Sequence, residues 1–114
     1  MTLTVSSLVG RSSFRALRSH GTRFGDGPVR LIFRPNEGDL RVAFAHGRAF
    51  GGAVQRNWAR RRLREAFVAL SRRQALTPGD YLFVCSPRVL NLTFSEIETR
   101  LERVARAVEA ATNA

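Results

Sequence analysis

The sequence lacks lysine altogether, and all 19 of its basic residues are arginines. It holds one cysteine, Cys85, which excludes an internal disulfide and any metal site built from several cysteines. No apolar run approaches the roughly 20 residues that a membrane-spanning helix needs, and residues 1–10 lack the basic start of a signal peptide. These absences favour a cytoplasmic protein with no membrane partner.

The charge balance is the most unusual property of the chain. Its 114 residues are 44% hydrophobic and 25% charged, which is ordinary for one globular domain, yet the net charge is +10. Such an excess points to a polyanionic partner. A genome-wide codon bias could account for arginine in place of lysine. In either case, guanidinium groups bind phosphate bidentately and stack on bases.

The chain divides into a lead-in, one domain and a tail. Residues 1–10 carry little pattern and are expected to be irregular. Residues 11–111 should form the domain, and residues 112–114 should be a short tail. There is no internal repeat and no low-complexity linker.

A short helix should open the domain. Ser12 or Ser13 can cap it, and it should run to about Ser19. Phe14 and Leu17, three residues apart, form its apolar stripe, and core packing is a sufficient explanation for Phe14 on this pattern alone.

Three apolar segments predict strands. Residues 29–34 and 40–45 are separated by a turn and should pair as an antiparallel hairpin, while the continuously apolar residues 81–85 should be an interior strand. Ala43 and Ala45 leave space on one face of the second strand. The pattern does not decide whether that space is a groove or is filled by the first helix.

A long helix is expected from about residue 53 to 73. On a wheel of about 100° per residue, its apolar residues form one stripe. The stripe contains Ala59, Leu63, Ala66, Phe67 and Leu70. The adjacent arc contains Asn57, Arg60, Arg61 and Arg64, with Arg56 at its edge. Trp58 and Arg62 point to a third side.

The last helix makes a useful contrast. Ser95 and Glu98 could form its capping box, and its stripe should pack on the sheet. That stripe contains Ile97, Leu101, Val104, Ala105 and Val108. The exposed charges of this helix are mixed, whereas residues 53–73 hold seven arginines and one glutamate. The arginine-rich helix therefore needs an explanation beyond ordinary surface charge.

An active site in the protein itself is not expected. His20 and His46 lie in separate segments, and Cys85 lies in a predicted buried strand. The three aspartates, which are expected to sit in turns with backbone roles, are Asp26, Asp39 and Asp80. No phosphate-binding loop or dinucleotide fingerprint is present.

RNA binding fits the arginine-rich helix better than the alternatives. Arginines in register along a helix can bind phosphates, and Asn57 can read a base edge or a sugar hydroxyl. A merely solvated face is disfavoured because like charges four residues apart destabilise a helix. DNA stays possible on charge alone, although strands and turns precede the helix where a helix-turn-helix would need another helix.

The segment GGAVQRNWARRRLREAF, residues 51–67, resembles the signature of the bacterial ribonuclease P protein subunit. Flanking segments match the family in order and spacing, so that the resemblance covers roughly residues 11–108. They are SFRALRSHG for the first helix, VRLIFR and LRVAFA for strands, and GDYLFVCSPRV and LTFSEIETRL for the last strand and helix.

The resemblance implies an α+β fold, with a mixed sheet packed by helices in the order α-β-β-(β)-α-β-α and an unusual left-handed βαβ crossover. In this family a catalytic RNA, with Mg²⁺ held mainly by the RNA, cleaves the 5′ leader from precursor tRNA. The protein binds that RNA and the leader. The resemblance thus implies no catalytic residue, metal site or obligate protein partner for this chain.

Site residues follow from the same resemblance. The RNA-binding positions are Arg48, Arg56, Asn57, Arg60, Arg61 and Arg64, and the leader cleft between the first helix and the open sheet face has Phe14, Arg18 and Phe33. Three positions depart from the family: Trp58 and Gly47 replace common basic residues, and Arg18 replaces a common aromatic. Trp58 could pack on the protein or stack on a base. The alternative function is a structural RNA-binding module without a catalytic complex.

Overall fold

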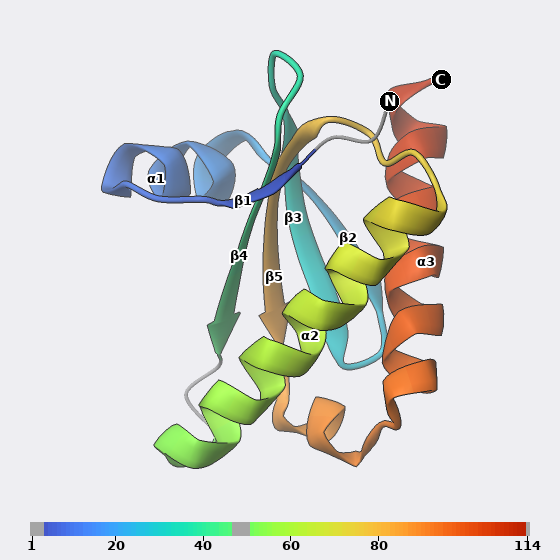
Figure 1. Cartoon of the computed structure of the whole chain (residues 1–114). Coiled ribbons are helices and arrows are strands. Elements are labelled where there is room, and N and C mark those ends of the chain that lie inside the picture. Colours follow the sequence, from blue (N-terminus) through green and yellow to red (C-terminus); the bar gives the residue numbers. More distant parts are fainter. Residues whose placement is uncertain (1–3, 47–50, 114) are drawn as a thin grey trace.

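A computed structural model describes residues 4–46 and 51–113, and it forms a mixed five-stranded sheet with three α-helices (Figure 1). This confirms the predicted α+β class. In chain order the elements are β1 (Val5–Ser7), α1 (Arg11–His20), β2 (Thr22–Asp26), β3 (Val29–Pro35), β4 (Leu40–His46), α2 (Ala53–Arg73), β5 (Gly79–Cys85), a 3-10 turn (Pro87–Asn91) and α3 (Phe94–Thr112).

The sheet has the strand order β1-β4-β5-β3-β2. β5 pairs parallel with β4 and antiparallel with β3, so the predicted hairpin between β3 and β4 is wrong. The prediction that β5 is an interior strand is confirmed, and it explains the error. Six of its seven residues are buried. A central position between β3 and β4 buries more of the apolar surface of β5 than an edge position would.

The connection from β4 through α2 to β5 has the rarer hand. In Figure 1 both strands run downward, α2 passes in front of them and β5 lies to the right of β4. This geometry is a left-handed crossover, as the family resemblance implied and against the usual right-handed rule.

The helices lie on two sides of the sheet. α2 and α3 cover one face, where their predicted stripes are buried in the main core together with Tyr81 and Phe83 of β5. α1 packs on the other face, where Leu17 contacts a smaller cluster with Ile32 and Leu82. Ala43 and Ala45 are partly buried against that cluster, which also contains Leu8, so part of the space beside the small side chains is filled.

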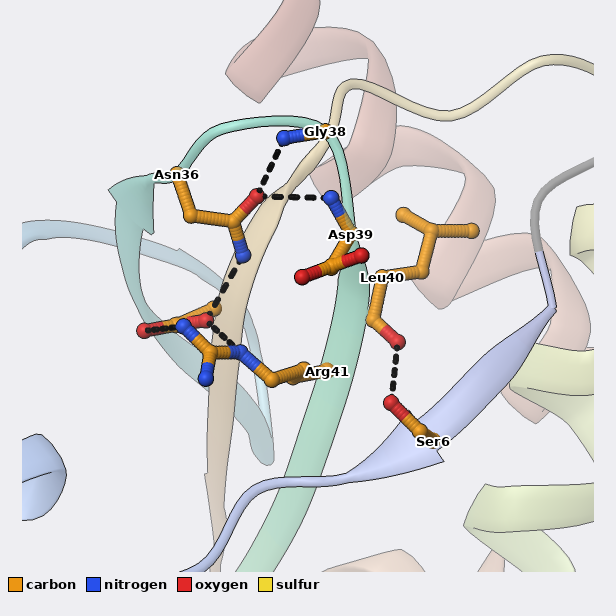
Figure 2. A network of polar contacts seen from close by, with 7 residues as sticks. Ser6, Asn36, Gly38, Asp39, Leu40 and Arg41 are labelled. Atoms are coloured by element: carbon orange, nitrogen blue, oxygen red, sulfur yellow. Dashed lines mark hydrogen bonds and ion pairs between the residues drawn. The ribbon is translucent and has the colours of Figure 1, made fainter.

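The loop between β3 and β4 is tied to β5 by a buried carboxylate (Figure 2). Asp80 accepts hydrogen bonds from Asn36 Nδ2 at 2.8 Å and from Arg41 Nε at 2.8 Å. The Asn36 side-chain oxygen in turn accepts from the backbone N–H groups of Gly38 and Asp39. Asp80 therefore lies in a strand and not in a turn as predicted, and it fixes the ends of three strands.

Two expectations for the start of the chain are wrong. Residues 1–10 are not wholly irregular, because β1 pairs parallel with β4 and completes that edge of the sheet. α1 begins at Arg11 after Gly10, with no side-chain cap from Ser12 or Ser13. Gly10 has φ 97°, a left-handed conformation that glycine adopts without a steric cost, and it turns the chain directly into the helix.

The capping box of α3 lies two residues earlier than predicted. Thr93 Oγ1 accepts from the Glu96 backbone N–H, and Glu96 Oε1 accepts from the Thr93 backbone N–H. Thr93 and Glu96 have the same three-residue spacing as Ser95 and Glu98, and Thr93 directly precedes the first helical residue.

Candidate nucleic-acid interface

The predicted RNA-binding side chains of α2 lie together on its solvent side. Arg56, Asn57, Arg60 and Arg61 are exposed and Arg64 is half-buried, while the apolar stripe on the opposite side seats the helix on the sheet. We call the group Arg56, Asn57, Arg60, Arg61 and Arg64 the arginine face. Arg48, the sixth predicted position, and Gly47 lie outside the described residues.

Two of the four arginines on the arginine face form no ion pair with the described residues. Within the described part of the chain, Asn57, Arg61 and Arg64 make no hydrogen bond or ion pair through their side chains. Arg56 Nε donates to its own chain, at the Gly51 carbonyl oxygen, at 3.0 Å. Closely spaced guanidinium groups on a rigid helix suit phosphates, which supply the missing negative charge.

The first turn of α2 projects beyond the sheet (Figure 1). Val54 is 80% exposed, and burial along α2 starts at Ala59. Trp58, between them, is half-buried and packs against the main core. The Arg62 guanidinium lies 4.7 Å from the Trp58 ring centroid and 5.8 Å from that of Phe94. The packing interpretation of Trp58 therefore holds, while part of its side chain stays exposed.

A second basic surface lies on the opposite side of the sheet, beside α1. Phe14 is half-buried there and Arg18 is exposed. The strand register adds three arginines to the same face. Directly paired residues of neighbouring strands, and alternate residues of one strand, have their side chains on one face of a sheet. These residues are Arg23, Arg30 and Arg34, all exposed. We call Phe14, Arg18, Arg23, Arg30 and Arg34 the open face.

The sheet arginines of the open face were not predicted from the sequence. Arg30 and Arg34 each lie two positions from Ile32 along the strand, and this alternation was the available signal. Arg41 also lies on this side, but its charge is paired with Asp80.

The placement of Phe33 beside Phe14 is wrong. Phe33 is 4% exposed and belongs to the main core under α2 and α3. Its ring lies 4.9 Å from that of Tyr81, and a Cβ added at Gly79 would collide with it. Successive strand residues face opposite sides, so the open face receives Ile32 in its place.

Two potentially reactive side chains of the described residues are buried. Burial raises the pKa of the Cys85 thiol to about 12, so it is protonated at neutral pH, and burial raises the Tyr81 pKa as well. Asp26 is engaged by ion pairs with Arg100 and Arg103. Across residues 4–46 and 51–113, no three His, Cys, Asp or Glu side chains gather into a candidate metal site.

The helices in the described ranges include none with the length and apolar character required to cross a bilayer.

Comparisons with known proteins agree on one family. The family model described as Ribonuclease P matches residues 4–109. A ribonuclease P protein component from Chloroflexus aggregans is 40% identical over 98 residues, covering 83% of this chain and 71% of the relative. One from Nitratiruptor is 28% identical over 105 residues, covering 92% of this chain and 94% of the relative.

Solved structures support the same fold. The ribonuclease P protein of Staphylococcus aureus superposes with a TM-score of 0.76 at 18% identity, covering 90% of this chain and 94% of that one. The protein from Thermotoga maritima gives 0.74 at 23% identity, covering 89% and 96%. The chain therefore belongs to the ribonuclease P protein family, the protein subunits of the endoribonuclease that processes the 5′ ends of tRNA.

Proposed function

We propose that the arginine face of α2 binds the RNA subunit of ribonuclease P and that the open face holds the single-stranded 5′ leader of precursor tRNA. Membership of the family implies association with the RNA but does not assign it to residues. The observation that carries the assignment is the placement of the two basic surfaces on opposite sides of one sheet.

The arginine face fits a structured RNA. Its side chains project from a 21-residue helix that the core holds in place, so their spacing is fixed before binding. Binding then neutralises the charges of Arg61 and Arg64, which form no ion pair with a carboxylate of the described residues. If the protein contacts roughly six phosphates, raising the salt concentration from about 50 to 200 mM should lower its affinity for RNA about a thousandfold.

The open face fits a single strand. Sites for single-stranded nucleic acid combine positive charges along the backbone with aromatic rings on which bases stack. Here Phe14 supplies a ring, and the exposed Arg18, Arg23, Arg30 and Arg34 supply the charges. The guanidinium of Arg18, where the family often has an aromatic residue, can itself stack on a base.

We assign the cleavage step and its Mg²⁺ to the RNA subunit. The donor set of the described residues does not fit a protein-held metal, since their His, Cys, Asp and Glu side chains are dispersed. The protein then acts by binding and orienting the RNA and the leader, without itself transferring a proton or attacking a phosphate.

Reconstitution tests this function. Purified protein is added, at low Mg²⁺, to a ribonuclease P RNA and a precursor tRNA with a leader. We expect faster cleavage with protein and RNA together than with RNA alone. RNA binding without any gain in cleavage would instead support a structural RNA-binding module, and cleavage by the protein alone would identify a protein-only nuclease.

The leader assignment has its own test. Phe14→Ala should weaken binding of a precursor tRNA that carries a leader by about 1–3 kcal/mol, the value of one base stacked on an aromatic ring. Binding of leaderless tRNA should not change. Equal losses for both substrates would show that Phe14 has only a packing role.

A further inference from the structure

We propose that Trp58, with the hollow beside it, is a docking site for an unpaired base of the RNA subunit. This inference rests on the proposed function of the arginine face and extends it from phosphate binding to a base contact. The hollow has a volume of about 370 Å³ and is lined by Val54, Asn57, Trp58 and Arg61.

Trp58 has different neighbours in the two directions along α2. Arg62, four residues later, stacks over the ring, whereas the hollow is lined by Val54, four residues earlier. Residues four apart are neighbours on a helix surface, so Arg62 and Val54 flank Trp58 from opposite directions along α2. The Arg62 contact and the packing against the core restrain the ring, and the hollow leaves another part of it accessible.

The lining of the hollow matches the parts of a nucleotide. Tryptophan offers an aromatic surface for a base, and stacking of this kind tolerates any sequence because every base has a π-face. The Asn57 amide can both donate to and accept from a base edge, and the Arg61 guanidinium can bind the adjoining phosphate. Val54 is 80% exposed, and a base bound in the hollow would shield its apolar side chain from water.

Charge and position favour RNA over another protein as the occupant. Asn57 and Arg61 belong to both the hollow and the arginine face, so a bound RNA would pass directly from one to the other. The helix that carries the hollow has seven arginines and one glutamate. A second copy of this chain would bring the same positive surface against itself, and repulsion would oppose that contact.

The fluorescence of Trp58 tests the proposal directly, because it is the only tryptophan in the chain. Full-length protein is titrated with a ribonuclease P RNA transcript while tryptophan emission is recorded. We expect quenching that saturates with binding. Unchanged emission at saturating RNA would overturn the proposal, as would an emission change that follows protein concentration without RNA, which would identify a second copy as the occupant.

Two variants separate stacking from folding. Trp58→Leu keeps an apolar side chain on the core and should weaken RNA binding by about 5- to 150-fold with an unchanged salt slope. Val54→Ser alters an exposed side chain and should lower the affinity for RNA roughly threefold without changing the thermal unfolding temperature. Wild-type affinity in both variants would refute the base-docking site.

The proposed function fails in a different way. Arg60→Ala with Arg64→Ala removes two members of the arginine face and leaves the hollow intact. If this variant loses affinity while Trp58 emission stays unchanged on RNA binding, the arginine face is supported and the base-docking site is rejected. If the variant binds like the wild type, the arginine face itself is rejected, and the inference falls with it.

Discussion

α2 and α3 lie on the same face of the sheet and contact each other, yet they differ in the balance of their charged residues. Each buries a stripe of apolar residues in the shared core. α3 has three arginines and four glutamates, and each of its arginines has a carboxylate partner. α2 has seven arginines and one glutamate, which cannot neutralise them within the helix.

The comparison separates the structural part of a helix from its functional part. Both stripes contribute to folding in the same way, so burial does not distinguish the helices. α3 satisfies its surface charges and its first turn within the protein, through ion pairs and the Thr93–Glu96 capping box. The first turn of α2 has no side-chain cap and projects beyond the sheet. α2 therefore keeps an excess of positive charge that α3 lacks, and the proposed function assigns this excess to RNA binding.

The largest expected effect is shared by both helices. Phe67→Ala in α2 should lower the free energy of unfolding by about 3–5 kcal/mol, and Leu101→Ala in α3 by about 2–5 kcal/mol, because both side chains are buried in the same core. Chemical denaturation of the two variants measures this. A cost near zero for either would show that its helix is not part of the common scaffold.

A smaller effect should be specific to α3. Thr93→Ala removes one half of the capping box and should lower the free energy of unfolding by about 1 kcal/mol. The control is Gly52→Ala at the corresponding position of α2, which makes no side-chain cap hydrogen bond to lose. An equal loss in both would mean that the capping difference between the helices is unimportant.

The same cap should respond to pH. The Thr93 backbone N–H and then its side chain hold the pKa of Glu96 below its ordinary value. The stabilisation is therefore fully present above the unfolded-state pKa and is lost as pH falls through the lower folded-state pKa. Between pH 7 and strongly acidic solution, Glu96→Gln should lose less thermal stability than the wild type. Parallel pH curves would argue against this contribution.

The smallest effect concerns the ion pair that joins the two helices. Arg73 Nη1 lies 2.7 Å from Glu98 Oε2, but the Arg73 side chain is 50% exposed. Arg73→Ala should therefore change the free energy of unfolding by less than about 1 kcal/mol. A larger loss in thermal unfolding would show that the helices depend on each other electrostatically.

The periodic elements could be predicted from the sequence, because the buried positions of a helix recur as apolar residues at regular spacing. The stripes of α2 and α3 and the interior position of β5 are examples. The placement of β5 between β3 and β4 could not be predicted, because it depends on contacts between residues distant in the chain. The three residues of β1 are too few to leave a pattern.

The candidate site divides in the same manner. The arginine face is encoded locally by helical spacing, and its described members lie where the wheel placed them. The open face depends on strand register, in which one residue decides the side. That is why Phe33 was misplaced and why Arg23, Arg30 and Arg34 were missed.

The salt dependence of binding to ribonuclease P RNA tests the central claim most directly. Dissociation constants of the wild type, Arg60→Ala/Arg64→Ala on α2 and Arg103→Ala/Arg106→Ala on α3 are compared between about 50 and 200 mM salt. We predict that the α2 variant flattens the logarithmic salt slope by about two units and that the α3 variant leaves it unchanged. Equal slopes for the α2 variant and the wild type, or a flattened slope for the α3 variant, would contradict the account.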